Sequence, residues 1–244
     1  MKARKKTKSK REIEHIRPEL QDVRQSQHRL LMTSSTIEQL LQVSPNDAQN
    51  YVGRLIEIDS DADNAYQAIA KVESARFDKR GGGYYKAKDP KRDLANKVRG
   101  IKGEMAILSV LNQHKIWYNF DHQLLYLPED KLGPDFILYP SGLKVEVKTG
   151  PADCNDLLIN ESQYKRWAKR NEIPDVILAL SATSNDYVFE VKGWVKGNSA
   201  NDKSRINKRL PSPAYSWPYD EINKIDDVAD FLYSLSKYGL TRLT

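Results

Sequence analysis

The sequence predicts an α/β fold, in which a mixed central sheet is flanked by helices and preceded by a helical extension. Three observations lead to this prediction. Helical and strand-like segments follow one another between residues 93 and 195 in the order α-β-β-β-α-β. Residues 133–150 have the pattern of two short strands joined by a tight turn. Residues 31–85 carry helical periodicity and no strand pattern, so we expect them to form the extension.

The N-terminal segment, residues 1–30, is strongly basic. It contains ten basic and four acidic residues and so accounts for the whole net charge of +6. Seven of the first eleven residues are Lys or Arg, and none of them is acidic. This run predicts a disordered arm suited to the phosphate backbone of a nucleic acid. A solubilising tail without a specific partner is the alternative.

Residues 31–85 are expected to form a helical accessory region. Helices are predicted over 35–43, 45–58 and 63–77. The start of the second is marked by Ser44 followed by Pro45, a capping residue before a proline in the first helical position. The glycine triplet 81–83 indicates a flexible joint before the main domain, which we expect to cover residues 86–195.

The main domain and the C-terminal region supply the remaining elements. The domain is expected to contain a helix over 93–113, a strand over 117–120 or 123–127, strands over 135–139 and 143–149, a helix over 160–170, and strands over 176–181 and 187–195. Residues 196–244 are expected to form a basic mobile loop, 196–213, and a helix over 220–239 that ends at Gly239 and packs on the core.

The hairpin at residues 133–150, GPDFILYPSGLKVEVKTG, carries the most informative side chains. Alternate residues of a strand share a face, so Glu146 and Lys148 should point one way, and Val145 and Val147 into the core. The turn over 139–142 favours close pairing of the two strands, which brings Asp135 near the acidic–basic pair. Two carboxylates beside a lysine form a site for a hard divalent cation and a phosphate.

Pro134-Asp135 followed by Glu146-Val147-Lys148 resembles the motif of the PD-(D/E)XK nuclease superfamily, which has the restriction-endonuclease-like fold. The resemblance covers residues 94–195. It implies a Mg²⁺-dependent endonuclease that hydrolyses DNA phosphodiester bonds, with Mn²⁺ able to replace Mg²⁺. In this family Asp135 and Glu146 would ligate the metal, together with the main-chain carbonyl of Val147, and Lys148 would assist attack by water.

The branch of the superfamily is left open by the residues. The order of the motif residues is similar to that of archaeal-type Holliday junction resolvases, which are homodimers, so a homodimer is one expectation. The extensions at both ends of this chain go beyond a minimal resolvase, and a restriction-type, phage or mobile-element nuclease fits equally well. The alternative functions are a non-cleaving nucleic-acid-binding module of the same fold and an RNA-processing nuclease.

A second Glu-x-Lys, formed by Glu190, Val191 and Lys192, provides an internal control for the motif. It also lies in a predicted strand, but no Pro-Asp precedes it and no turn-linked strand leads into it. We interpret it as an ordinary strand with one face in water, and the same reading is the alternative for Glu146 and Lys148.

Glu104 is the third candidate acid. At 3.6 residues per turn it falls at the centre of the apolar face of the helix over 93–113, where a carboxylate requires a partner or a metal. In the family an acid on this helix often completes the metal shell; a Glu at the edge of the apolar stripe, or one paired with a lysine, is the alternative. Gly100 and Gly103 are poor helix residues, which suggests that another group approaches this helix closely.

The helix over 160–170 contributes weaker candidates. Gln163 has two equally weighted interpretations: it completes a capping box with Asn160, or it corresponds to the glutamine that RecB-like members of the family carry near the site. Basic residues are candidates for contacts with nucleic acid, although a solvated face is the alternative, and they are Lys165, Arg166, Lys169, Arg170, Lys203 and Arg205. Trp167 is expected in the core.

Composition excludes several classes of protein. No apolar run approaches the roughly 18 residues that span a bilayer, and the basic N-terminus lacks the apolar region of a secretory signal, so no membrane partner is expected. Cys154 is the only cysteine, which excludes an intramolecular disulfide and a cysteine-based zinc site. A cytoplasmic location and Mg²⁺ rather than Zn²⁺ fit this composition.

Overall fold

The computed structural model describes residues 51–79, 90–120, 134–210 and 212–242, all of which belong to one unit spanning residues 44–244. The basic arm, the expected helix over 35–43, the glycine triplet and the alternative strand over 123–127 lie outside these ranges.

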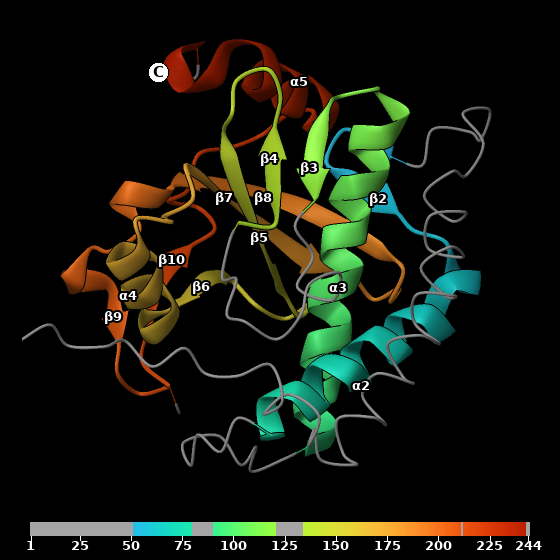
Figure 1. Cartoon of the computed structure of the whole chain (residues 1–244), viewed down its shortest axis with the longest axis vertical. Helices are drawn as coiled ribbons and strands as arrows, with labels where there is room; N and C mark the ends of the chain where they lie inside the picture. Colours follow the sequence, from blue (N-terminus) through green and yellow to red (C-terminus); the bar gives the residue numbers. More distant parts are fainter. Residues whose placement is uncertain (1–50, 80–89, 121–133, 211, 243–244) are drawn as a thin grey trace, which may run out of the picture. The chain divides into compact units, whose positions relative to one another are not determined.

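A mixed seven-stranded sheet forms the centre of this unit, as predicted (Figure 1). Its strand order is β1-β2-β8-β7-β5-β4-β3. Only the β5–β7 pair is parallel; the other neighbours are antiparallel. The strands are β1 (Tyr51–Val52), β2 (Leu55–Glu57), β3 (Tyr118–Phe120), β4 (Phe136–Leu138), β5 (Lys144–Gly150), β7 (Val176–Ala182) and β8 (Val188–Lys196).

The elements predicted between residues 93 and 195 are found in the expected sequence, with shifts of a few residues at their ends, but an additional strand, β6 (Asp156–Asn160), lies between β5 and α4 (Glu161–Arg170). α3 (Pro90–Gln113) leads into β3, β4 and β5, and α4 precedes β7 and β8. β4 and β5 form the expected hairpin, in which Phe136 is opposite Val145. The alternation in β5 is also as expected, since the side chains of Val145 and Val147 are buried.

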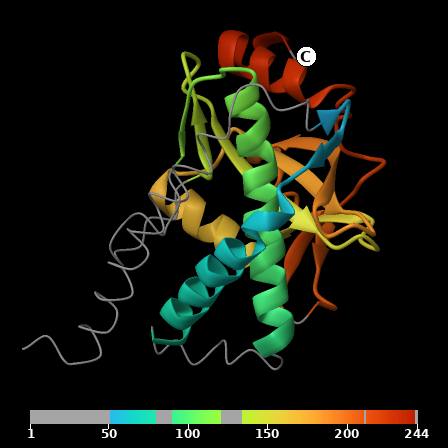
Figure 2. The same cartoon turned by 90° about the vertical axis from the view of Figure 1, so that its right-hand side faces the viewer.

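α3 and α4 cover opposite faces of β5 (Figure 1). A side chain added at Gly103 of α3 would overlap the side chain of Thr149, so the helix backbone lies directly on this face of the strand. Trp167 of α4 lies beneath Lys148, which points to the other face. Figure 2 shows α2 (Asp63–Lys79) against the N-terminal half of α3, and α5 (Val228–Tyr238) beyond its C-terminal end.

The helix expected over 45–58 is wrong for residues 51–57, which form the hairpin of β1 and β2. Gly53 occupies the first position of its two-residue turn with a φ of 56°, a conformation that glycine adopts without strain. Ile56 is fully buried, and β2 pairs with β8, so this hairpin extends the central sheet. The predicted helix over 63–77 is confirmed as α2.

A second, three-stranded sheet was not predicted. It has the order β6-β10-β9 and consists of β6 (Asp156–Asn160), β10 (Ala214–Pro218) and β9 (Ile206–Asn207). β6 alternates in burial, with Leu157 and Ile159 in the core and Leu158 exposed, which matches the period of a strand. The segment expected as a loop instead contains two 3₁₀ turns, at Gly197–Ser199 and Lys203–Arg205, and a buried Ala200.

The C-terminal helix is shorter than predicted. α5 begins after Asp227, whose carboxylate accepts hydrogen bonds from the backbone N–H groups of Ala229 and Asp230. It ends at Gly239, as expected, with a φ of 65°. Across the part of the chain that the structure describes, no helix is both long and apolar enough to cross a membrane.

Candidate active site

The candidate site forms where the pairing between β4 and β5 ends. The two strands pair only at Phe136 with Val145 and at Ile137 with Lys144. Beyond that point β4 no longer supplies a backbone acceptor, and the carboxylate of Asp135 takes its place: its Oδ2 accepts a hydrogen bond of 2.7 Å from the N–H of Val147. Asp135 is thereby held against the middle of β5, as the sequence predicted.

Glu146 is the most unusual residue of the site, because its carboxylate is buried. Its side chain is 4 % exposed. One oxygen, Oε1, lies 2.5 Å from Nζ of Lys148 and 3.2 Å from the amide nitrogen of Gln163. The other oxygen, Oε2, is buried and has no hydrogen-bond partner among the described residues. A buried carboxylate oxygen without a partner is unfavourable by about 1–3 kcal/mol or more, so it calls for a ligand.

The ammonium group of Lys148 lies between the carboxylate of Glu146 and the ring of Trp167. Its Nζ is 5.5 Å from the centre of the Trp167 ring. Burial of the ammonium group lowers the pKa of Lys148, but the charges of Glu146, Asp135 and Glu104 and the hydrogen bond to Glu146 outweigh burial. The pKa of Lys148 is therefore raised above the ordinary lysine value, and the group carries its charge at neutral pH.

Glu104 contributes to the site from α3. It is half-buried rather than fully enclosed by the apolar stripe, and its charge acts on Lys148. The close approach expected for this helix is found at Gly103, which lies against Thr149 of β5. At Gly100 a side chain would meet open space, so the close approach explains only one of the two glycines.

The capping-box interpretation of Gln163 is met only in part, because Asn160 caps α4 but the Gln163 amide donates to Glu146 instead of completing the box. The backbone N–H of Gln163, with that of Ser162, donates to the side chain of Asn160, which caps α4 as predicted. Its side-chain amide donates to Glu146, so the glutamine belongs to the site. Trp167 is buried as expected. Its contact with Lys148 was not predicted, although its spacing of four residues from Gln163 places it on the same side of α4.

The basic residues of α4 are all exposed, but they lie on different sides of the helix. Arg166 and Arg170 are three and seven residues after Gln163, so they flank the side of α4 that faces the site. Lys165 and Lys169 lie about half a turn away, and Lys165 pairs with Glu161 at 2.7 Å.

The two basic candidates outside α4 differ as well. Lys203 is exposed. Arg205 forms an ion pair of 2.6 Å with Glu221 and stacks on Trp217, with 4.0 Å between the guanidinium carbon and the ring centre. Arg205 therefore has a structural function at the second sheet.

The second Glu-Val-Lys lies in β8 and has a different environment. The side chains of Glu190 and Lys192 are 26 % and 27 % exposed and form an ion pair with each other. Arg54 adds a second cation at 3.5 Å from Glu190. The expectation of a partly wet strand face is confirmed for this copy.

The donor groups of the candidate site suit a hard cation with few protein ligands. Within the described ranges, no group of three or more His, Cys, Asp or Glu side chains is arranged to hold a metal ion. Mg²⁺ usually takes one or two carboxylates and keeps several waters, whereas structural zinc needs four protein ligands. The buried Oε2 of Glu146 and the neighbouring carboxylate of Asp135 fit the first arrangement.

Comparison with known proteins adds no assignment: the chain matches no protein-family model and no curated protein sequence.

Proposed function

We propose that the protein is a Mg²⁺-dependent endonuclease of the PD-(D/E)XK type that hydrolyses phosphodiester bonds of DNA. The observation that carries this proposal is the buried carboxylate of Glu146, which has one oxygen bound to Lys148 and Gln163 and the other without a partner. A buried strand carboxylate beside a lysine and a second acid is an arrangement that can support metal-assisted phosphodiester hydrolysis.

The order of elements supports the same proposal. Apart from the inserted strand β6, the succession α3, β3, β4, β5, α4 and β7 agrees with the α-β-β-β-α-β order expected for a restriction-endonuclease-like core. Glu104 comes from α3, Asp135 directly precedes β4, and Glu146 and Lys148 lie in β5.

Asp135 and Glu146 would hold the metal, with the carbonyl of Val147 as a further ligand, and Glu104 would complete the shell through a metal-bound water. Bound Mg²⁺ lowers the pKa of its water and neutralises negative charge on the phosphate. Lys148 carries its positive charge next to Glu146 and stabilises the extra negative charge that develops on the phosphate in the transition state. Gln163 orients the Glu146 carboxylate by donating a hydrogen bond to it.

Arg166 and Arg170 are the basic residues best placed to bind the DNA backbone. They extend from the side of α4 that bears Gln163, and their exposed guanidinium groups suit phosphate contacts. Lys165 and Lys169, on the far side of the same helix, offer matched controls. Replacing Arg166 or Arg170 by Ala should weaken DNA binding and reduce its salt dependence by about one ion per lost contact, whereas the lysine variants should change neither.

Cleavage of supercoiled plasmid in Mg²⁺, Mn²⁺ and Ca²⁺ tests the proposal. We expect nicking with Mg²⁺ or Mn²⁺ and none in the Asp135→Asn variant. DNA binding without cleavage under every metal condition would instead support the non-cleaving module, and cleavage restricted to an RNA substrate in the same assay would support the RNA-processing alternative.

Metal binding can be measured without activity. A ligand that binds only the folded state raises the melting temperature, so Ca²⁺ should stabilise the wild-type protein. This stabilisation should be lost in the Asp135→Asn variant. An equal shift in both proteins would show that the cation binds elsewhere.

A further inference from the structure

An exposed aromatic surface lies at the end of the molecule where α3 meets β3 and the β4–β5 turn. Trp117 is 78 % exposed and Tyr139 is 43 % exposed, and the N–H of Tyr139 donates a hydrogen bond of 2.8 Å to the carbonyl of Trp117. Trp167 and Trp194 are buried at 1 % and 4 %. Exposed aromatic residues that lie together, rather than singly, are typical of a surface used for binding.

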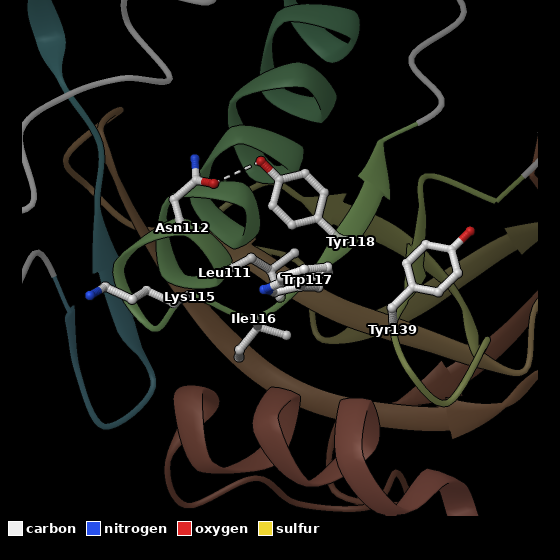
Figure 3. Close-up of a pocket in the computed structure, with 7 residues that line it drawn as sticks. All are labelled: Leu111, Asn112, Lys115, Ile116, Trp117, Tyr118 and Tyr139. Carbon is white, nitrogen blue, oxygen red and sulfur yellow. Dashed lines mark hydrogen bonds between the residues drawn. The ribbon is translucent and has the colours of Figure 1, made fainter.

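Trp117 and Tyr139 line a pocket of about 460 Å³ (Figure 3). Its floor is apolar and consists of Leu111 and Ile116, both buried. Tyr118 forms one wall and is held in place, because its hydroxyl donates a 2.7 Å hydrogen bond to Asn112. The volume lies within the roughly 300–1,000 Å³ of ligand pockets, so the site can accept a planar ring.

Positive charge accompanies the aromatic rings. Lys115 lines the pocket, and it is exposed. On the neighbouring α5, Lys237 lies 5.5 Å from the ring centre of Tyr233, a further exposed aromatic residue. α5 is attached to this region through Ser236, whose hydroxyl donates to the carbonyl of Tyr139. Aromatic rings with interspersed lysines suit the bases and phosphates of a nucleic-acid strand.

The pocket and the candidate active site share two elements. Leu111 follows Glu104 by seven residues on α3, a rise of about 10 Å along the helix. Tyr139 follows Asp135 by four residues along β4 and its turn, about 13 Å of extended chain. A single strand of nucleic acid a few nucleotides long can therefore reach both.

We propose that this pocket binds unpaired nucleotides, with a base stacked on Trp117 and Tyr139 and the adjoining phosphate near Lys115. The inference rests on the proposed function, since it assigns part of the substrate of the same nuclease. It predicts a preference for DNA that carries a single-stranded region next to the cleavage position. In duplex DNA the bases are already stacked on one another and cannot occupy the pocket.

A fluorescence titration in EDTA tests the inference without cleavage. Oligothymidylate should quench the emission of wild-type protein, because Trp117 is accessible and a stacked base quenches its fluorescence. Trp117→Ala should abolish most of this quenching and lower the affinity for a labelled oligothymidylate, measured by anisotropy, by about tenfold or more. Binding of a blunt duplex should change little.

Val52→Ala provides the matched control. Val52 is also 78 % exposed but lies on β1, and its replacement should leave oligothymidylate binding unchanged. Unchanged oligothymidylate binding by Trp117→Ala would overturn the inference even if plasmid cleavage persists. If oligothymidylate binding depends on Trp117 but the protein cleaves no substrate, the pocket still binds unpaired nucleotides and the proposed nuclease function is wrong.

Sedimentation of the wild type and of both variants tests whether a second copy of the chain, rather than a nucleic acid, binds this surface. If the wild-type protein is a dimer that Trp117→Ala converts to a monomer, with oligothymidylate affinity unaltered, the surface is an interface between two copies and the inference is wrong.

Discussion

The chain contains the tripeptide Glu-Val-Lys twice in strands of one sheet, and in both copies the lysine pairs with the glutamate, but the two glutamates lie in different environments. In β5, Glu146 is 4 % exposed, donors from Lys148 and Gln163 share one of its oxygens, and the other has no partner among the described residues. In β8, Glu190 is 26 % exposed and is neutralised by Lys192 and Arg54. The same local sequence thus produces a buried carboxylate in one place and a partly solvated ion pair in the other.

The difference comes from the neighbours of each strand. β8 is paired along its length, with β7 on one side and β2 on the other at Glu190. β5 loses its β4 partner beyond Val145, and the gap admits the carboxylate of Asp135. A motif of three residues becomes a candidate site only where the sheet opens and other acids converge on it.

The largest expected effect is on activity. Glu146→Ala should lower the rate of Mg²⁺-dependent plasmid nicking on the order of 10³-fold, because it removes a group that holds the metal beside the phosphate. Glu190→Ala should leave the rate nearly unchanged. Circular dichroism checks that both variants are folded; if Glu190 proves essential and Glu146 dispensable, the assignment of the two copies is reversed.

The second effect is on stability. Lys148→Met leaves the buried carboxylate of Glu146 without its cation and should lower the free energy of unfolding by about 3 kcal/mol. Lys192→Met should cost less than about 1 kcal/mol, since its partner is partly solvated and retains Arg54. Urea unfolding of the two variants in EDTA measures the contrast, and equal losses would argue against a special environment in β5.

The approach of α3 to β5 offers a smaller effect. Gly103→Ala would drive a methyl group into Thr149 and should destabilise the protein by about 1–3 kcal/mol. Gly100→Ala meets no such obstacle and should stabilise the helix by roughly 0.5–1 kcal/mol. Thermal melts that move in the same direction for both variants would contradict the close packing that brings Glu104 to the site.

The smallest effect is confined to alkaline pH. The folded-state pKa of Lys148 is raised, so its protonated form contributes stability that is fully present below the unfolded pKa of about 10.4. This contribution declines as the pH rises through the folded pKa. The stability difference between wild type and Lys148→Met should therefore be constant from pH 7 to 9 and shrink above pH 10.5, as followed by urea unfolding; a difference that grows there would have the wrong sign.

Local patterns were sufficient for much of the core. The period-2 alternation of β5, the helical spacing of α3 and the capping of α4 by Asn160 are visible in a few neighbouring residues, and each prediction is confirmed. The hairpin of β1 and β2 leaves little local pattern, because its strands are only two and three residues long and its turn lies at Gly53 within a segment of helical spacing.

The residue types of the candidate site were also apparent from the order of Asp135, Glu146 and Lys148 along one hairpin, because strand geometry dictates which neighbours share a face. The partner of Gln163 and the position of Trp167 beneath Lys148 were decided by tertiary packing. So was the pairing of β6 with β10, whose residues are separated by more than fifty positions in the chain. Burial and charge depend on every element that packs around a side chain, and a local pattern records only the nearest of them.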